Sequence, residues 1–350
     1  MSDTLSSVAE KLMEQTNNNL SGAMGQLSVN SDKTPTPPKN LSDMPIYVVV
    51  LIIERSDYKE QLILRKVSKS LRELVDKQKP ALTSLNVFFD FHYIECFYNT
   101  DKQIYSVPHI GADNYWFGKK SKRVIMSDDY EKIAFDDLAS SLKNPKLQLN
   151  SFSAEFRYHL RDLYAKFGGF LESIGHQVSV RSCKIEINVP GEYCPILPYL
   201  KPKVLEKITV LYRSQRDSSG VDPAWETVKR IALLDQWKQA EELELVYGCE
   251  VFPMKYAKHF KRFRFNEYKV DDRLLIRIRN YLSKLNNFEL CSISAEWPVD
   301  AQHLRRVVGD PAAPNERTKY VSHYSIPNSD DYLEFTFFEF SIEIRKIKRS

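Results

Sequence analysis

Cysteine pairs, long apolar runs and a secretory signal are all missing from this sequence. Its five cysteines are widely spaced and form no CxxC pair, which argues against a disulfide framework or a zinc knuckle. The longest apolar run covers only the eight residues 46–53, whereas a transmembrane helix needs roughly 20. The first residues lack the basic and apolar regions of a signal peptide. We therefore expect an intracellular protein, cytoplasmic or nuclear, whose cysteines stay reduced.

The motifs of common enzyme classes are missing as well. The sequence contains no GxGxxG, GxxxxGKS/T, GxSxG or HExxH, and its seven histidines are scattered without metal-ligand spacing. Cys194 lies in a Tyr-Cys-Pro turn with no histidine close in sequence to act as its base. The sequence therefore predicts a protein that is not an enzyme and that needs no cofactor and no metal.

The net charge is too small to point to a polyanionic partner. The chain has 50 basic and 46 acidic residues, a net charge of +4, so local sequence has to identify any partner. Residues 255–265 interleave basic and aromatic side chains, as a surface that binds single-stranded nucleic acid does. The alternative is a strand in which Phe263 and Phe265 face the core while Arg262 and Arg264 face solvent. We favour the strand and leave RNA binding open.

What the sequence does have is enough apolar residue content for about two folded domains. It has 350 residues, of which 43% are hydrophobic. Residues 1–40 are rich in Ser, Asn and Thr and end in Thr-Pro-Thr-Pro-Pro, a composition that predicts a disordered tail. We divide the remainder into residues 41–79 and residues 80–350.

Hydrophobic spacing predicts mixed α and β structure. Apolar residues recur at helical spacing over residues 64–75, which predicts an amphipathic helix, and over residues 154–174, which predicts one long helix. The β-branched run at residues 46–53 fits a buried strand by pattern alone, although Pro45 suits the start of a helix. Alternating segments predict strands at residues 85–91, 93–98, 104–107 and 124–126.

Beyond residue 184 short strands alternate with helices. The predicted strands cover residues 185–189, 208–212, 243–247, 263–265 and 288–293, and their starts are 23, 35, 20 and 25 residues apart. These intervals are close to those of solenoids with one strand and one helix per repeat. Residues 333–347 are expected to close the chain as a strand pair or one long strand. The predicted fold is therefore a small helical domain followed by a mixed α/β domain, a curved solenoid of leucine-rich-repeat type.

Residues 44–76 contain Met44-Pro45, the apolar run to Ile53, Asp57-Tyr58-Lys59, Leu64-Arg65-Lys66-Val67, Leu71-Arg72 and Leu74-Val75-Asp76. With these residues the segment resembles the F-box, most closely that of nematode F-box proteins with an FTH domain. Three positions depart from the usual pattern, since Ser56 replaces a leucine, Ser68 a cysteine and Leu71 an aromatic residue. The resemblance implies that residues 46–53 form a helix that is buried between two chains.

Much of the remaining chain is similar to the FTH domain, most clearly over residues 200–347. The two resemblances together span about residues 40 to 347. The markers of the FTH domain follow one another in the order of that family. They are residues 142–147 (LKNPKL), residues 234–240 (LDQWKQA), residues 324–329 (YSIPNS), Leu333-Glu334-Phe335, Ile342, Ile344 and Ile347.

The resemblance implies a substrate-recognition adaptor of a cullin ubiquitin ligase. The F-box would bind a Skp-family adaptor, and through it a cullin, in a shared apolar core, while the FTH domain would recruit an unknown protein target. For each F-box residue the alternative is that it packs against the protein's own second domain. The predicted adaptor contacts are Pro45, Val48, Val49, Ile52, Leu62, Leu64 and Val67.

Two further interpretations stay open in the sequence. The protein would act as a protein- or RNA-binding scaffold if it never engages a ligase. Trp225 and Trp237 are candidate interface residues because tryptophan is enriched at binding hot spots. Both lie in predicted helices, where burial against the sheet is the commoner outcome, so we favour the core for both.

Overall fold

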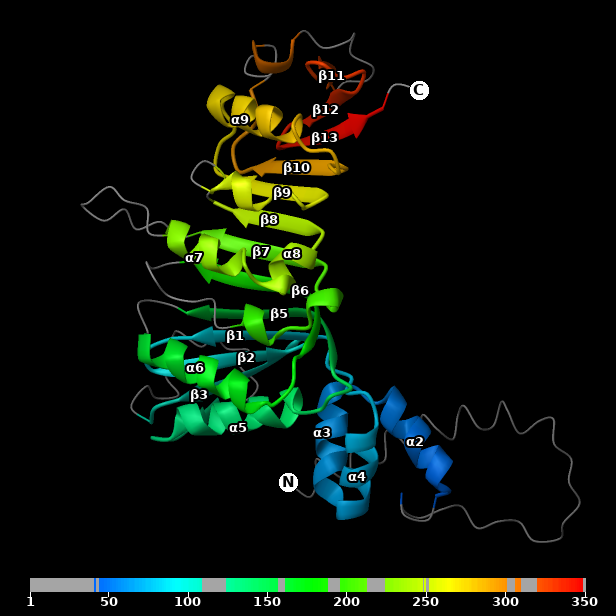
Figure 1. Cartoon of the computed structure of the whole chain (residues 1–350). Coiled ribbons are helices and arrows are strands. Elements are labelled where there is room, and N and C mark those ends of the chain that lie inside the picture. The colour runs from blue at the N-terminus through cyan, green and yellow to red at the C-terminus, as the bar shows by residue number, and fades with distance from the viewer. Residues whose placement is uncertain are drawn as a thin grey trace, which may run out of the picture.

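A computed structural model describes residues 41, 44–108, 124–156, 161–187, 196–212, 224–247, 249, 252–300, 306–309 and 320–348. The predicted disordered tail and Cys194 lie outside these described residues, as does the side chain of Trp225. The described residues form a small group of N-terminal helices beside one end of a long stack of strands (Figure 1). The mixed α/β class with a helical N-terminal region, predicted from the sequence, is therefore confirmed.

The N-terminal group consists of α2 (Ile46–Arg55), α3 (Tyr58–Val67) and α4 (Lys69–Lys77). Asp57 begins α3 with a capping box, because its side chain accepts from Glu60 N while the Glu60 side chain accepts from Asp57 N. Ser68 ends α3 and caps α4 by accepting a hydrogen bond from Leu71 N. The single helix predicted over residues 64–75 is therefore two helices. Residues 46–53 are helical, as the F-box resemblance implied.

The described strands form one 13-stranded sheet in the order β11-β12-β13-β10-β9-β8-β7-β6-β5-β1-β2-β3-β4. From β5 to β10 the strands lie in the sheet in the order in which they occur along the chain, and each is parallel to its neighbours in this series. The strands are β1 (Ser84–Phe89), β2 (Tyr93–Tyr98), β3 (Asp101–Ser106), β4 (Val124–Met126), β5 (Gln148–Phe156), β6 (Ser179–Ile187), β7 (Lys207–Tyr212), β8 (Glu242–Val246), β9 (Arg262–Glu267), β10 (Leu290–Ala295), β11 (Tyr320–Ser325), β12 (Tyr332–Phe338) and β13 (Ser341–Ile347).

The larger helices after β4 lie over one face of this sheet (Figure 1). Strand side chains alternate between the two faces, so that face buries apolar side chains such as Leu243 and Leu245 of β8 and Phe263 and Phe265 of β9. The opposite face carries the polar residues of the same strands and is here called the open face. No described helix is both long and apolar enough to cross a membrane. The helices are α5 (Tyr130–Leu142), α6 (Arg161–Ser173), α7 (Ala224–Ile231), α8 (Asp235–Gln239) and α9 (Asp272–Leu282).

Strand β5 was not predicted from the sequence. The helix expected over residues 154–174 begins only at Arg161, because Ala154 and Phe156 belong to a strand that pairs with β1 on one side and β6 on the other. Pairing on both sides satisfies the backbone of β5, and its apolar residues fit the core face of the sheet as well as they fit a helix. Within α6 the apolar residues Leu163 and Phe167 of the predicted helix are buried as expected.

Candidate protein-binding sites

Helix α2 exposes large apolar side chains. Ile46 and Tyr47 are each 66% exposed and Leu51 is 48% exposed. Tyr47 and Leu51 are four residues apart, so they lie on the same side of the helix. Val67, at the end of α3, adds a further exposed apolar side chain. The exposed apolar side chains of α2 make this helix a candidate interaction site.

The structure buries three of the seven predicted adaptor contacts within the chain itself. Val49 and Leu64 form a small core with Ile53 and Leu71, and this core holds α2, α3 and α4 together. Ile52 is also buried, at 5% exposure. A contact between these three side chains and an adaptor stays a prediction, and in the free chain they support the helices from inside.

The other four predicted contacts are accessible to different degrees. Pro45 and Val67 are exposed and Val48 is partly buried. Leu62 packs against the main core of the sheet, the alternative that the sequence left open. Sequence reasoning missed Ile46, Tyr47 and Leu51, although they belong to the same apolar run. Only the helical geometry of this run separates its exposed side from its buried side.

Tyr58 of α3 joins the helical segment to the sheet. Its ring stacks on that of Tyr98 in β2, with centroids 5.8 Å apart, and its hydroxyl hydrogen-bonds to Ser141 Oγ in α5. Burial raises the pKa of Tyr58 to about 12, so the hydroxyl stays neutral near pH 7. Tyr58 belongs to the main core of the sheet rather than to the small helical core.

Further hydrogen bonds cross the same junction. Gln61 Oε1 accepts from Ala81 N at 2.9 Å while its Nε2 donates to Ile53 O at 3.0 Å. Lys146 Nζ, from the segment after α5, donates to the carbonyl of Lys77 at the end of α4. A cleft of about 250 Å³ remains between α3, α4 and the end of α5. The helical segment is therefore docked on the sheet by specific contacts.

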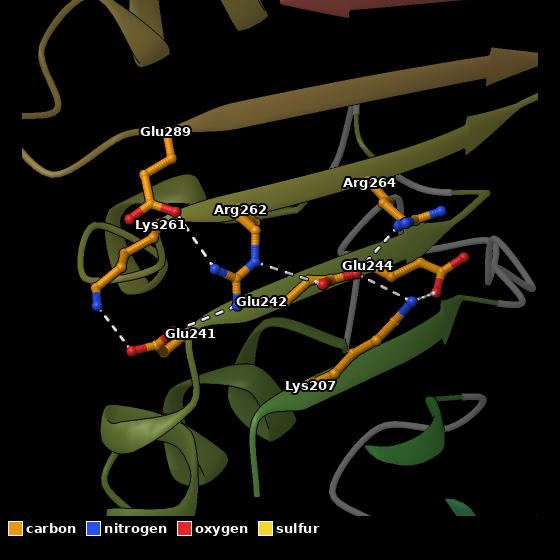
Figure 2. Close-up of polar contacts among 8 residues, drawn as sticks. All are labelled: Lys207, Glu241, Glu242, Glu244, Lys261, Arg262, Arg264 and Glu289. Atoms are coloured by element: carbon orange, nitrogen blue, oxygen red, sulfur yellow. Dashed lines mark hydrogen bonds and ion pairs between the residues drawn. The ribbon is translucent and has the colours of Figure 1, made fainter. Parts of the chain in front are cut away.

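The open face carries a ladder of paired charges across β7, β8 and β9 (Figure 2). Strand register places Lys207, Glu242 and Arg262 in one row, so neighbouring charges alternate in sign. Lys207 Nζ lies 3.1 Å from Glu242 Oε1 and 2.7 Å from Glu244 Oε2. Arg264 Nε lies 3.1 Å from Glu242 Oε1. This face is polar but internally neutralised.

Burial and pairing act in opposite directions on Glu244. Partial burial alone would raise the pKa of its carboxyl group, but hydrogen bonds from Lys207, Asn266 and Thr209 outweigh it and lower the pKa. Glu244 is therefore ionised near neutral pH, as the ladder requires.

Arg262 is the most highly paired cation of this ladder. It contacts Glu241 and Glu289 at 3.3 Å each and Glu242 at 3.7 Å. We expect Arg262→Ala to lower the free energy of unfolding by about 1 kcal/mol, because exposed pairs contribute about 0.2–1 kcal/mol each. In urea unfolding, the loss should shrink at about 1 M salt. Arg264→Ala, which removes contacts to Glu242 alone, is the matched control, and an equal loss in both variants would contradict the ranking.

The aromatic side chains that would bind nucleic acid in residues 255–265 are largely buried. Phe260, Phe263 and Phe265 are fully buried or nearly so and cannot stack on bases. Arg262 and Arg264 are on the opposite face and are paired with carboxylates. The strand interpretation of this segment is therefore confirmed.

A metal site and a reactive thiol each place requirements on the described residues. Among them, no three His, Cys, Asp or Glu residues come together in a way that could hold a metal ion. Cys96, Cys183, Cys249 and Cys291 are buried, and desolvation raises the pKa of the Cys96 thiol above its usual range.

The exposed side of α2 and the charge ladder both lie in segments that match known domain families. The F-box domain matches residues 41–82, and the FTH domain matches residues 161–308. The chain carries an F-box domain and an FTH domain. The family resemblance recognised in the sequence is thus confirmed. F-box A protein 224 of Caenorhabditis elegans is 23% identical over 314 residues, which cover 86% of this chain and 78% of that protein.

No solved structure matches the chain. The F-box match contains α2, α3 and α4, so the exposed side of α2 is part of the F-box. The FTH match contains α6 to α9 and β6 to β10, so the charge ladder lies in the FTH domain. Strands β1 to β5 and helix α5 lie between the two matches, and this part of the chain contains Tyr98 and Ser141, the two contacts of Tyr58.

Proposed function

We propose that the chain is a substrate-recognition adaptor of a Skp–cullin–F-box ubiquitin ligase. The observation that carries the proposal is the exposed apolar side of α2, formed by Ile46, Tyr47 and Leu51, inside a matched F-box domain. Apolar groups of this size are covered by a partner in most proteins, and the partner of F-box domains is in general a Skp-type adaptor. Pro45, Val48 and Val67 would extend the contact, while Val49, Ile52 and Leu64 would hold the helices in place from inside.

The target would bind the FTH domain at the open face of the sheet. The unbroken parallel order from β5 to β10 supports a curved solenoid, and solenoids commonly use their extended strand face for binding. At this face the FTH domain would meet a target through the polar groups of its strands. Ubiquitin transfer needs no catalytic group in this chain, because other subunits of the ligase supply it, and such a ligase would place the protein in the cytoplasm or nucleus.

The contacts between the F-box and the sheet would fix the orientation of the two binding surfaces. Because Tyr58 fixes α3 against β2 and α5 and Gln61 binds Ala81 just before β1, the adaptor-binding side of α2 and the open face would keep a constant relative orientation. A target bound to the FTH domain would thereby be held at a defined distance from the ligase.

Isothermal titration of the full-length chain with a purified Skp-family adaptor tests the proposal. We expect one-to-one binding with a dissociation constant of about 1 μM or lower, equivalent to about 8 kcal/mol. Cullin should then join the complex in size-exclusion chromatography only when the adaptor is present. Absence of measurable heat and of co-elution would favour the alternative, a scaffold that does not engage a ligase.

A further inference from the structure

Large aromatic side chains gather where β8, β9 and β10 end. Tyr247 and Tyr268 directly follow β8 and β9, and Trp297 is the second residue after β10. Phe340 lies in the turn between β12 and β13, at the same end of the sheet, because β13 is antiparallel to β10. Trp297 is 65% exposed, Tyr268 57% and Phe340 45%. We call these four residues the aromatic ledge.

Backbone hydrogen bonds hold the ledge in place. Tyr247 N donates to Asn266 O at 2.9 Å, Trp297 N donates to Tyr268 O at 3.1 Å, and Ala295 N donates to Phe340 O at 2.9 Å. The rings of Tyr247 and Tyr268 stack with centroids 4.3 Å apart and an interplanar angle of 15°. The four side chains therefore come from neighbouring loops that are tied to one another.

Tyr247 adopts a backbone conformation that only a few per cent of non-glycine residues take. Its φ is 54°, in the left-handed region, where a bulky side chain is strained. Strain of this kind persists only where the surrounding structure imposes it, and it is concentrated at functional sites. Here it accompanies the stacking of the Tyr247 ring on Tyr268.

Carboxylates accompany the aromatic rings. The Tyr247 hydroxyl donates to Glu296 Oε1 at 2.5 Å, which fixes that carboxylate next to Trp297 in the chain. Glu267 precedes Tyr268, and Glu339 precedes Phe340. Against these three carboxylates the same short loop segments contribute one basic residue, Lys269. The ledge is therefore both aromatic and acidic on a chain whose net charge is +4.

We propose that the aromatic ledge is a docking site for an arginine-bearing segment of a target protein. A guanidinium group is attracted to the faces of tyrosine and tryptophan rings, and carboxylates bind it with charge-assisted hydrogen bonds. Exposed Tyr and Trp are also the side chains that most often dominate binding energy at protein interfaces. The inference rests on the proposed target-recruiting function, and it specifies that the target carries an arginine-bearing segment.

The charges of the ledge distinguish a protein partner from a nucleic acid. Aromatic rings also stack on unpaired bases, but single-stranded nucleic acid binds where a positive groove follows its phosphates. Glu267, Glu296 and Glu339 would repel those phosphates.

The experiment measures binding of three fluorescent probes to the full-length chain. The first is a peptide of three arginines spaced by glycine and serine, the second is its glutamine counterpart, and the third is an oligouridine. We expect the arginine peptide to bind at least about tenfold more tightly than the glutamine peptide, since two cation–π contacts of about 0.7 kcal/mol give that factor. Tyr268→Ala combined with Trp297→Ala should remove the preference, and Glu296→Gln should reduce it by about threefold.

Phe91→Ala is the matched control, because Phe91 is 54% exposed but lies between β1 and β2, and it should leave the preference unchanged. Equal binding of the three probes, preference for oligouridine, or an unchanged preference in the double variant would each overturn the proposal. Titration of the same variants with a Skp-family adaptor separates the two hypotheses. Normal adaptor binding without an arginine preference contradicts the ledge alone, whereas failure of the wild-type chain to bind the adaptor contradicts the ligase function.

Discussion

Aspartate at positions 47 and 51 is expected to weaken binding of a Skp-family adaptor at least about 100-fold, or about 2.7 kcal/mol, without unfolding the chain. Tyr47 and Leu51 are 66% and 48% exposed and occupy one side of α2. If an adaptor covers them, the two carboxylates lose their hydration without gaining partners, which costs several kcal/mol. In the free chain the same carboxylates stay in water, so the fold should tolerate them.

Isothermal titration measures the affinity, and circular dichroism with thermal unfolding checks the fold. Leu233→Asp combined with Ile276→Asp is the matched control, because these exposed apolar residues, 70% and 40% accessible, lie outside the F-box. Binding at wild-type affinity by the folded Tyr47/Leu51 variant would refute the assignment of this side of α2 to the adaptor.

Aspartate at Val49 and Ile52, two of the adaptor contacts predicted from the sequence, has a different expected effect. Both side chains are 5% exposed in the free chain, and Val49 is part of the small core with Ile53 and Leu64. Carboxylates there would disrupt the packing of α2 against α3 and α4. Adaptor binding would be lost together with the local fold, so this variant cannot identify the contact surface.

Trp237→Ala is expected to lower the free energy of unfolding by about 3–5 kcal/mol, the range for large aromatic deletions in protein cores. The ring is 1% exposed and packs against Phe252 and Phe260, with centroids 6.3 and 5.1 Å away. Its Nε1 donates to Tyr256 O at 2.8 Å, so truncation also leaves a buried carbonyl without this donor. Urea unfolding followed by circular dichroism at 222 nm measures the loss.

Trp297→Ala is the matched comparison, since the same side chain is 65% exposed there. Its loss should stay within about 0.5 kcal/mol, as for surface substitutions in general. The two variants should therefore separate stability from binding, because Trp237 belongs to the core and Trp297 to the aromatic ledge. Similar losses of stability at both positions would contradict this division.

Short-range pattern in the sequence located most of the strands correctly. The capping residues Asp57 and Ser68 fix where α3 and α4 begin by bonds to residues only three positions away. Alternation along β9 likewise determined that Phe263 and Phe265 are buried while Arg262 and Arg264 are not. The ordered markers of the F-box and FTH domains were also readable, because they depend on residue identity alone.

Only the tertiary structure decided which apolar residues are available to a partner. Ile46 to Ile53 read as one apolar run, and the fold covers Val49, Ile52 and Ile53 while leaving Tyr47 and Leu51 exposed. Leu62 is drawn to the sheet core because Tyr58, one turn earlier, is anchored on Tyr98 and Ser141.

The same limit applies to β5 and to the aromatic ledge. Residues 148–156 form a strand because β1 and β6, from separate parts of the chain, pair with both of its edges. The ledge exists because three parallel strands and one turn end side by side, which brings together residues from 247 to 340. Local spacing specifies the period and faces of an element, whereas exposure and neighbours depend on contacts between residues far apart in sequence.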